Sequence, residues 1–166
     1  MANKASFTAE EWRQLVQSPM LAGMAITAAD PSGLFGLVKE GLAASRALAE
    51  AKSVAGTNEL IGAVVADFET AEGRDAVRDG LKARFAGSEA ADLKPKAITA
   101  LRETAALLET KAPEDAPAFK AWLEDIARRV AEASKEGGFL GFGGVQVSDA
   151  EKATLAEIST ALNRTA

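Results

Sequence analysis

Residues 19–29 have the sequence PMLAGMAITAA, in which an apolar side chain or Gly occupies almost every position. Ser18 and Pro19 resemble a helix start, with Ser18 as the N-cap and Pro19 at the first helical position. A helix that is apolar on all sides is normally buried in the middle of a fold. We therefore expect a central apolar helix at about 19–29, with the rest of the chain packed around it.

A short helix is expected to precede this central segment. Thr8 and Glu11 have the spacing of a capping box, which places the helix start just after Thr8. Phe7 and Trp12 occupy the two positions of a hydrophobic staple. Because Ser18 indicates a new N-cap, the sequence predicts that the first helix ends before it.

A long helix at about 31–54 is expected to follow, because Asp and Pro at positions 30 and 31 repeat the cap signal. Gly41 and Ser45 lie in the centre of its apolar stripe. Side chains this small allow another backbone to approach closely. We expect that backbone to be the helix at 19–29.

Further amphipathic patterns complete an all-α fold. They lie at about 58–86 (as one helix or two), at 95–111, at 116–136, and from the Ser148–Glu151 capping box to about Asn163. The chain is rich in Ala and poor in the strand-favouring Val and Ile. The predicted fold class is a compact bundle of roughly six to eight helices in one domain over residues 1–166. A weaker subdivision at the linker 112–117 is the alternative.

The composition excludes several kinds of chemistry. The chain contains no His and no Cys. It therefore lacks imidazole for acid–base relays and metal ligation, and thiolates for nucleophilic attack or zinc binding. A di-iron site, which helical bundles build with His and Glu, is excluded as well. We predict no metal site and no cofactor, and we assign no catalytic residue.

The charge of the chain bears on its partners and location. The formal net charge is −5, and nucleic acids are bound largely through Lys and Arg, so a nucleic-acid partner is not expected. The longest uncharged stretch, between Arg13 and Asp30, is shorter than the roughly 20 apolar residues of a membrane span. The first residues do not resemble a signal peptide. We expect a soluble cytoplasmic protein without a membrane span.

A Gly-rich loop at 137–147, GGFLGFGGVQV, precedes the last helix. It lacks the Lys-Ser/Thr pair of a P-loop, and no strand or third Gly completes a dinucleotide fingerprint. One interpretation is a loop that covers an open end of the bundle, with Gly supplying the turns. The other is a contact surface for a ligand or another chain, which would use the candidate binding residues Phe139, Leu140, Phe142, Gly143 and Gly144.

Two Met residues and one carboxylate are further candidates. Met20 and Met24 lie one helical turn apart, and adaptable Met side chains sometimes line a cavity for an apolar ligand, although plain core packing is the simpler interpretation. Asp67 lies at the border of an apolar arc and is expected to meet a Lys or Arg there. Arg74, Arg78 and Lys82 form a basic row that neighbouring Asp residues are expected to neutralise.

The leading functional hypothesis is a non-enzymatic helical binding or assembly module that contacts another protein or a second copy of itself. The alternative is a carrier of an apolar small molecule bound between helices. An enzyme that uses only carboxylate, Lys, Ser or Thr chemistry is the third hypothesis, and the least favoured, because no residue pair suggests it.

Overall fold

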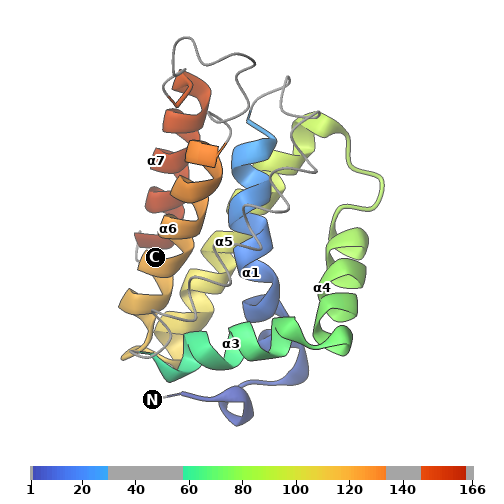
Figure 1. Cartoon of the computed structure of the whole chain (residues 1–166), viewed down its shortest axis with the longest axis vertical. Helices are drawn as coiled ribbons and strands as arrows, with labels where there is room; N and C mark the ends of the chain where they lie inside the picture. The colour runs from blue at the N-terminus through green and yellow to red at the C-terminus, as the bar shows by residue number, and fades with distance from the viewer. Residues whose placement is uncertain (1, 30–57, 134–146, 164–166) are drawn as a thin grey trace.

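The computed structural model describes residues 2–29, 58–133 and 147–163, and this part of the chain is all-α (Figure 1). A 3-10 turn, Lys4–Ser6, precedes the first helix. The described helices are α1 (Ala9–Thr27), α3 (Glu59–Glu69), α4 (Ala71–Arg84), α5 (Ala90–Lys111), α6 (Ala116–Ala133) and α7 (Asp149–Asn163). The all-α class and the expected number of helices are thereby confirmed.

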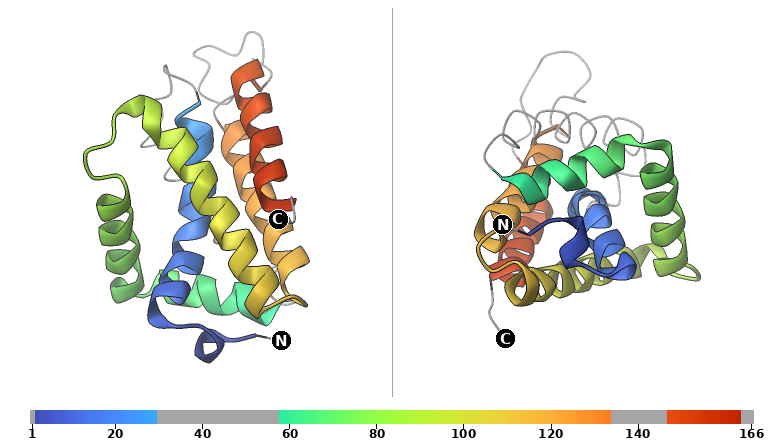
Figure 2. Two further views of the ribbon diagram at one scale, coloured as in Figure 1. Left: turned by 180° about the vertical axis from the view of Figure 1, so that it is seen from behind. Right: turned by 90° about the horizontal axis from the view of Figure 1, so that it is seen from below.

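Helix α1 lies at the centre of the described fold. It contacts α3, α4, α5, α6 and α7. Seen from below, it lies inside the frame that the other helices form (Figure 2). Leu21, Ala22 and Ala25, from the predicted central segment, are completely buried. The prediction that residues 19–29 are central is correct.

The predicted helix boundary at Ser18 and Pro19 is wrong, because α1 runs through both residues without a break. Pro19 has no amide hydrogen, so the carbonyl of Leu15, four residues earlier, lacks its usual helical donor. The Ser18 hydroxyl donates a hydrogen bond of 2.7 Å to that carbonyl and satisfies it. Ser18 is therefore part of the helix interior and compensates locally for the proline.

We expect Ser18→Ala to lower the free energy of unfolding by about 1–2 kcal/mol, because the mutation leaves the buried Leu15 carbonyl without this donor. Urea denaturation followed by circular dichroism measures the change. Thr110→Ala is the matched control, since the exposed Thr110 donates a similar bond to Ala106 within an intact helix. Equal stability losses in the two variants would contradict the role given to Ser18.

Residues 58–86 form two helices that meet at Thr70. The Thr70 amide donates to the Asp67 carbonyl at the end of α3, and its hydroxyl accepts from the amide of Gly73 in α4. Gly73 is buried, and an ideal Cβ there would lie 1.9 Å from the Asp67 carbonyl oxygen. The corner therefore closes tightly because Gly73 has no side chain.

Helix α5 begins at Ala90, five residues before the expected start at Pro95. The Asp92 carboxylate accepts a hydrogen bond from the Glu89 amide and stabilises this earlier start. Pro95 then lies in the second turn, with its ring exposed to solvent. The helix start therefore lies before Pro95, in residues that the sequence did not assign to a helix.

The last two helices begin where the sequence predicts. Helix α6 starts at Ala116 after the Pro-containing linker, and its buried face includes Phe119, Leu123, Ile126 and Val130. At the start of α7, Ser148 and Glu151 exchange the two hydrogen bonds of the predicted capping box. The predicted helix at 31–54, with Gly41 and Ser45, lies outside the described residues.

One buried carboxylate joins three parts of the fold. Asp115, just before α6, accepts a 2.8 Å hydrogen bond from the Ala2 amide and a 3.1 Å bond from the Asn58 side chain. Asn58 in turn caps α3 by accepting from the Ile61 amide. Asp115 therefore links the N-terminal segment and the start of α3 to the start of α6.

Candidate functional site

The described residues include only part of the predicted binding set. Phe139, Leu140, Phe142, Gly143 and Gly144 lie outside the described residues, so the loop hypothesis stays a prediction. Met20 and Met24 are half-buried on α1, and Met20 packs against the core. Neither Met lines the cleft described next. The predicted cavity at these two Met residues also stays a prediction.

A cleft of about 400 Å³, which we call the Trp12 cleft, lies between the N-terminal segment, the first half of α1 and the α3–α4 corner. Its floor is apolar and nearly buried, formed by Phe7, Trp12, Val16 and Val77. Its rim carries the polar side chains of Lys4, Thr8, Arg13 and Asp67, which are more exposed than the floor, and Ala9, Gly73 and Ala76 complete the lining. An apolar floor with a few polar groups around it is typical of a binding site.

Local sequence signals position the aromatic part of this floor. Thr8 and Glu11 form the predicted capping box and fix the start of α1. Phe7 and Trp12, the predicted hydrophobic staple, pack with their ring centroids 6.0 Å apart. The pair that stabilises the helix start therefore also shapes the cleft.

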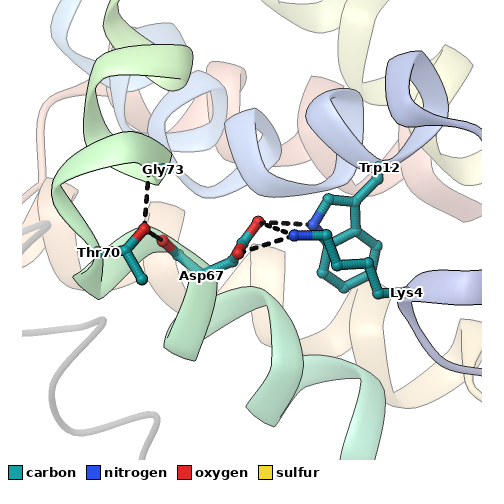
Figure 3. A network of polar contacts seen from close by, with 5 residues as sticks. All are labelled: Lys4, Trp12, Asp67, Thr70 and Gly73. Carbon is teal, nitrogen blue, oxygen red and sulfur yellow. Dashed lines mark hydrogen bonds and ion pairs between the residues drawn. The ribbon is translucent and has the colours of Figure 1, made fainter.

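Asp67, at the end of α3, holds the polar side of the cleft together (Figure 3). Its carboxylate accepts a 2.7 Å hydrogen bond from the Trp12 indole and bonds of 3.0 and 3.1 Å from the Lys4 ammonium. The Lys4 Nζ also lies 5.6 Å from the centroid of the Trp12 ring. The expectation that Asp67 meets a Lys or Arg is confirmed, with Lys4 as the partner.

These contacts determine the ionisation of Asp67. Partial burial alone would raise the pKa of this carboxyl group. The hydrogen bonds from Trp12 and Lys4, together with the charge of Lys4, outweigh burial and bring the pKa below its ordinary value. Asp67 is therefore an anion near neutral pH, bound to both of its partners.

This lowered pKa predicts a pH dependence. Since the folded state holds the proton less tightly than the unfolded state, Asp67 stabilises the fold above its unfolded pKa of about 4. That contribution is lost as the pH falls through the lower folded-state pKa. We expect Asp67→Asn to destabilise the protein by about 1–2 kcal/mol at pH 7, and the difference from the wild type to shrink toward pH 2. Urea denaturation of both proteins across this pH range measures it, and a constant difference would contradict the assignment.

Arg13 is the one lining residue whose charge has no partner within the described part of the chain. Its side chain is exposed on α1. An ideal Cβ on Gly80 of α4 would lie 3.6 Å from the Arg13 Cδ, so the aliphatic stem lies close to α4. Among the described residues, no acidic side chain pairs with the guanidinium at the edge of the apolar floor. Nothing in the sequence distinguishes this Arg from the others, so the sequence does not predict its role.

Two other cavities have different chemistry. One of about 350 Å³ lies between α6 and α7, where Asp125 pairs with Arg128 and Arg129. Burial opposes the ionisation of Asp125, but the hydrogen bonds from both Arg residues are stronger and lower its pKa. The second, of about 290 Å³, lies between α5 and α7. Neither is lined by an aromatic side chain, so the Trp12 cleft is the better candidate.

One residue of the predicted basic row on α4, Arg78, is neutralised by Asp residues as expected. Arg78 pairs with Asp75 at 2.8 Å and with Asp79 at 3.3 Å. Arg74 donates to the Glu69 carbonyl at the α3–α4 corner. These contacts favour a solvated, salt-bridged face over a phosphate-binding one.

The chain matches no protein-family model, and no curated protein or solved structure is significantly similar to it. Among the described helices, none combines the length and the apolar character that crossing a membrane requires. Residues 2–29, 58–133 and 147–163 contain no cluster of three or more acidic side chains arranged to hold a metal ion. The geometry of the Trp12 cleft is therefore the basis for the functional proposal.

Proposed function

We propose that this protein is a non-enzymatic helical binding module that contacts another protein through the Trp12 cleft. The observation that carries the proposal is the combination of a nearly buried aromatic floor with an exposed, partly charged rim. Aromatic residues and Arg are enriched where proteins bind one another. A Cys-free chain has no disulfide that needs an oxidising compartment, and we propose a cytoplasmic location.

The charged groups of the cleft favour binding over catalysis. Lys4 and Asp67 are paired with each other, and Asp67 is also bound to the Trp12 indole. A general acid or base works best when its pKa lies near the operating pH, whereas the pKa of Asp67 is lowered away from it. The paired side chains maintain the shape of this surface, and Asp67 is not poised to transfer a proton.

The small exposed area of the cleft floor favours a protein partner over a small molecule. A ligand pocket commonly encloses most of its ligand. Here the floor residues Trp12 and Val16 are only 4% and 3% exposed, so most of their surface is already packed inside the protein. A cleft of about 400 Å³ whose floor is so little exposed suits one or two side chains that project from a larger partner.

Selection from a phage-displayed library of random peptides on the immobilised full chain tests this proposal. An enriched peptide is then measured against Ala76→Phe, which places a ring at the exposed cleft residue Ala76. Ala83→Phe, on an exposed position of the same helix away from the cleft lining, is the matched control. We expect Ala76→Phe to weaken binding at least about tenfold and Ala83→Phe to leave it unchanged. Equal affinity for both variants, or no enriched peptide, would refute the proposal.

A further inference from the structure

We infer that the segment recognised by the Trp12 cleft carries a bulky apolar side chain next to an Asp or Glu, whose carboxylate binds Arg13. The inference rests on the proposed function and specifies the chemistry of the partner. It assigns the apolar side chain to the floor formed by Trp12, Val16 and Val77. It assigns the anionic group to the guanidinium of Arg13 at the edge of that floor.

The stem of Arg13 lies close to α4, and its charge has no partner among the described residues. Its stem lies close to α4 at Gly80, where the absence of a side chain leaves room for Arg13 and for the buried Gln17. Its guanidinium makes no hydrogen bond or ion pair with any described residue, whereas Lys4, on the same rim, is bound to Asp67. A planar guanidinium with a positioned stem binds a carboxylate through two parallel hydrogen bonds at a low entropic cost.

The remaining charges of the cleft select an acidic partner over a basic one. Asp67 is the acidic residue of the lining, and its two carboxylate oxygens already accept three hydrogen bonds from Lys4 and Trp12. A Lys or Arg of the partner would have to displace those donors. With Lys4 and Asp67 paired, the charge left over among the lining residues is that of Arg13.

Most of both subsites lies on α1, and Val77 of α4 completes the apolar floor. Arg13 directly follows Trp12 in α1, and Val16 lies one turn further on. The backbone of α1 therefore fixes Arg13 relative to Trp12 and Val16. A partner segment with neighbouring apolar and acidic side chains reaches both at once, which is the pattern we expect to be selected.

The peptide selection described above tests the inference when the enriched sequences are examined for acidic residues. We expect Asp or Glu next to Leu, Ile, Phe or Trp. A synthetic copy of the best peptide, blocked at both ends, is compared with its Glu→Gln or Asp→Asn form against the wild type and Arg13→Gln. Arg102→Gln, which removes the same charge from an exposed position on α5 away from the cleft lining, is the matched control.

We expect Arg13→Gln to weaken binding of the acidic peptide about fivefold, and the amide form of the peptide to lose the same amount. Combining Arg13→Gln with the amide form of the peptide should weaken binding little more than either change alone, since both remove the same contact. Arg102→Gln should bind as the wild type does, and circular dichroism verifies that each variant is folded.

Other outcomes separate the inference from the function on which it rests. Enriched peptides that lack acidic residues, or that bind Arg13→Gln as tightly as the wild type, overturn the inference. If Ala76→Phe still abolishes their binding, the proposed function stands. Analytical ultracentrifugation tests whether the wild type self-associates and whether Ala76→Phe abolishes the association. If both hold, the occupant of the cleft is a second copy of the chain, and the proposal of a peptide-like partner is overturned. Failure to enrich any peptide overturns both proposals.

Discussion

Gly73→Ala should lower the free energy of unfolding by about 2 kcal/mol, even though Ala is intrinsically the better helix former by about 1 kcal/mol. The Cβ of an Ala at this position would lie 1.9 Å from the Asp67 carbonyl oxygen and 2.9 Å from the Thr70 hydroxyl oxygen. The first of these neighbours is backbone, so no side-chain rotation relieves the contact. The α3–α4 corner has to open, and this strains the hydrogen bonds in which the Thr70 hydroxyl donates to the Asp67 carbonyl and accepts from the Gly73 amide.

The structural effect of Gly73→Ala should also be detectable at the Trp12 cleft. Asp67 supplies the backbone carbonyl that the new methyl group displaces and the carboxylate that binds the Trp12 indole. Opening the corner therefore moves this carboxylate, and we expect the indole N–H resonance of Trp12 to shift in the folded Gly73→Ala variant.

Gly80→Ala, in the same helix, is the control for Gly73→Ala. A Cβ at Gly80 meets the Nε2 atom at the end of the Gln17 side chain, at 1.9 Å, and that side chain is able to rotate. We expect the stability of this variant to change by less than about 1 kcal/mol in either direction, because the gain in helix propensity offsets the displacement. Urea denaturation compares the two variants, and a Gly80→Ala variant as destabilised as Gly73→Ala would contradict the explanation.

The sequence predicted the features of the fold that depend on local interactions. The capping boxes at Thr8–Glu11 and Ser148–Glu151 place helix starts correctly because both partners lie within one turn. The Ser18–Pro19 boundary failed for a different reason. The usual N-cap pattern is overridden when packing holds the helix together and the Ser hydroxyl replaces the missing amide donor.

The candidate site depends on contacts that are distant in the sequence. Phe7 and Trp12 were identified from their spacing as a staple, and Asp67 as a carboxylate that needs a basic partner. Lys4 is 63 residues from Asp67, and no periodicity connects the two. The role of Arg13 depends on how α1 packs on α4, because only the tertiary contacts show that no described residue pairs with its charge. The sequence therefore predicted several residues of the site but not how they are arranged in space.

The second large effect is expected at the buried Asp115. Asp115→Ala should lower the free energy of unfolding by about 3 kcal/mol, because the Ala2 amide and the Asn58 side-chain amide both lose their acceptor. Each is a polar group in a buried setting, since Ala2 is 9% and Asn58 is 8% exposed. Unsatisfied buried donors cost about 1–3 kcal/mol each, and partial relaxation toward solvent reduces the sum.

Asp115→Asn distinguishes the loss of an acceptor from the loss of packing. Asn has nearly the same volume as Asp, but one of its two terminal groups is a donor and would face the donor of Ala2 or of Asn58. We therefore expect Asp115→Asn to lose more than half of the unfolding free energy that Asp115→Ala loses.

Asp92→Ala is the control, because Asp92 also accepts from a backbone amide but at an exposed helix start, where water replaces it. Its expected cost is about 0.5–1 kcal/mol. Urea denaturation of the three variants measures these differences, and an Asp115→Asn variant as stable as the wild type would show that Asp115 acts through its shape alone. The expected order, with Asp115→Ala least stable and Asp92→Ala most stable, follows from burial: the same kind of hydrogen bond contributes most where water cannot take its place.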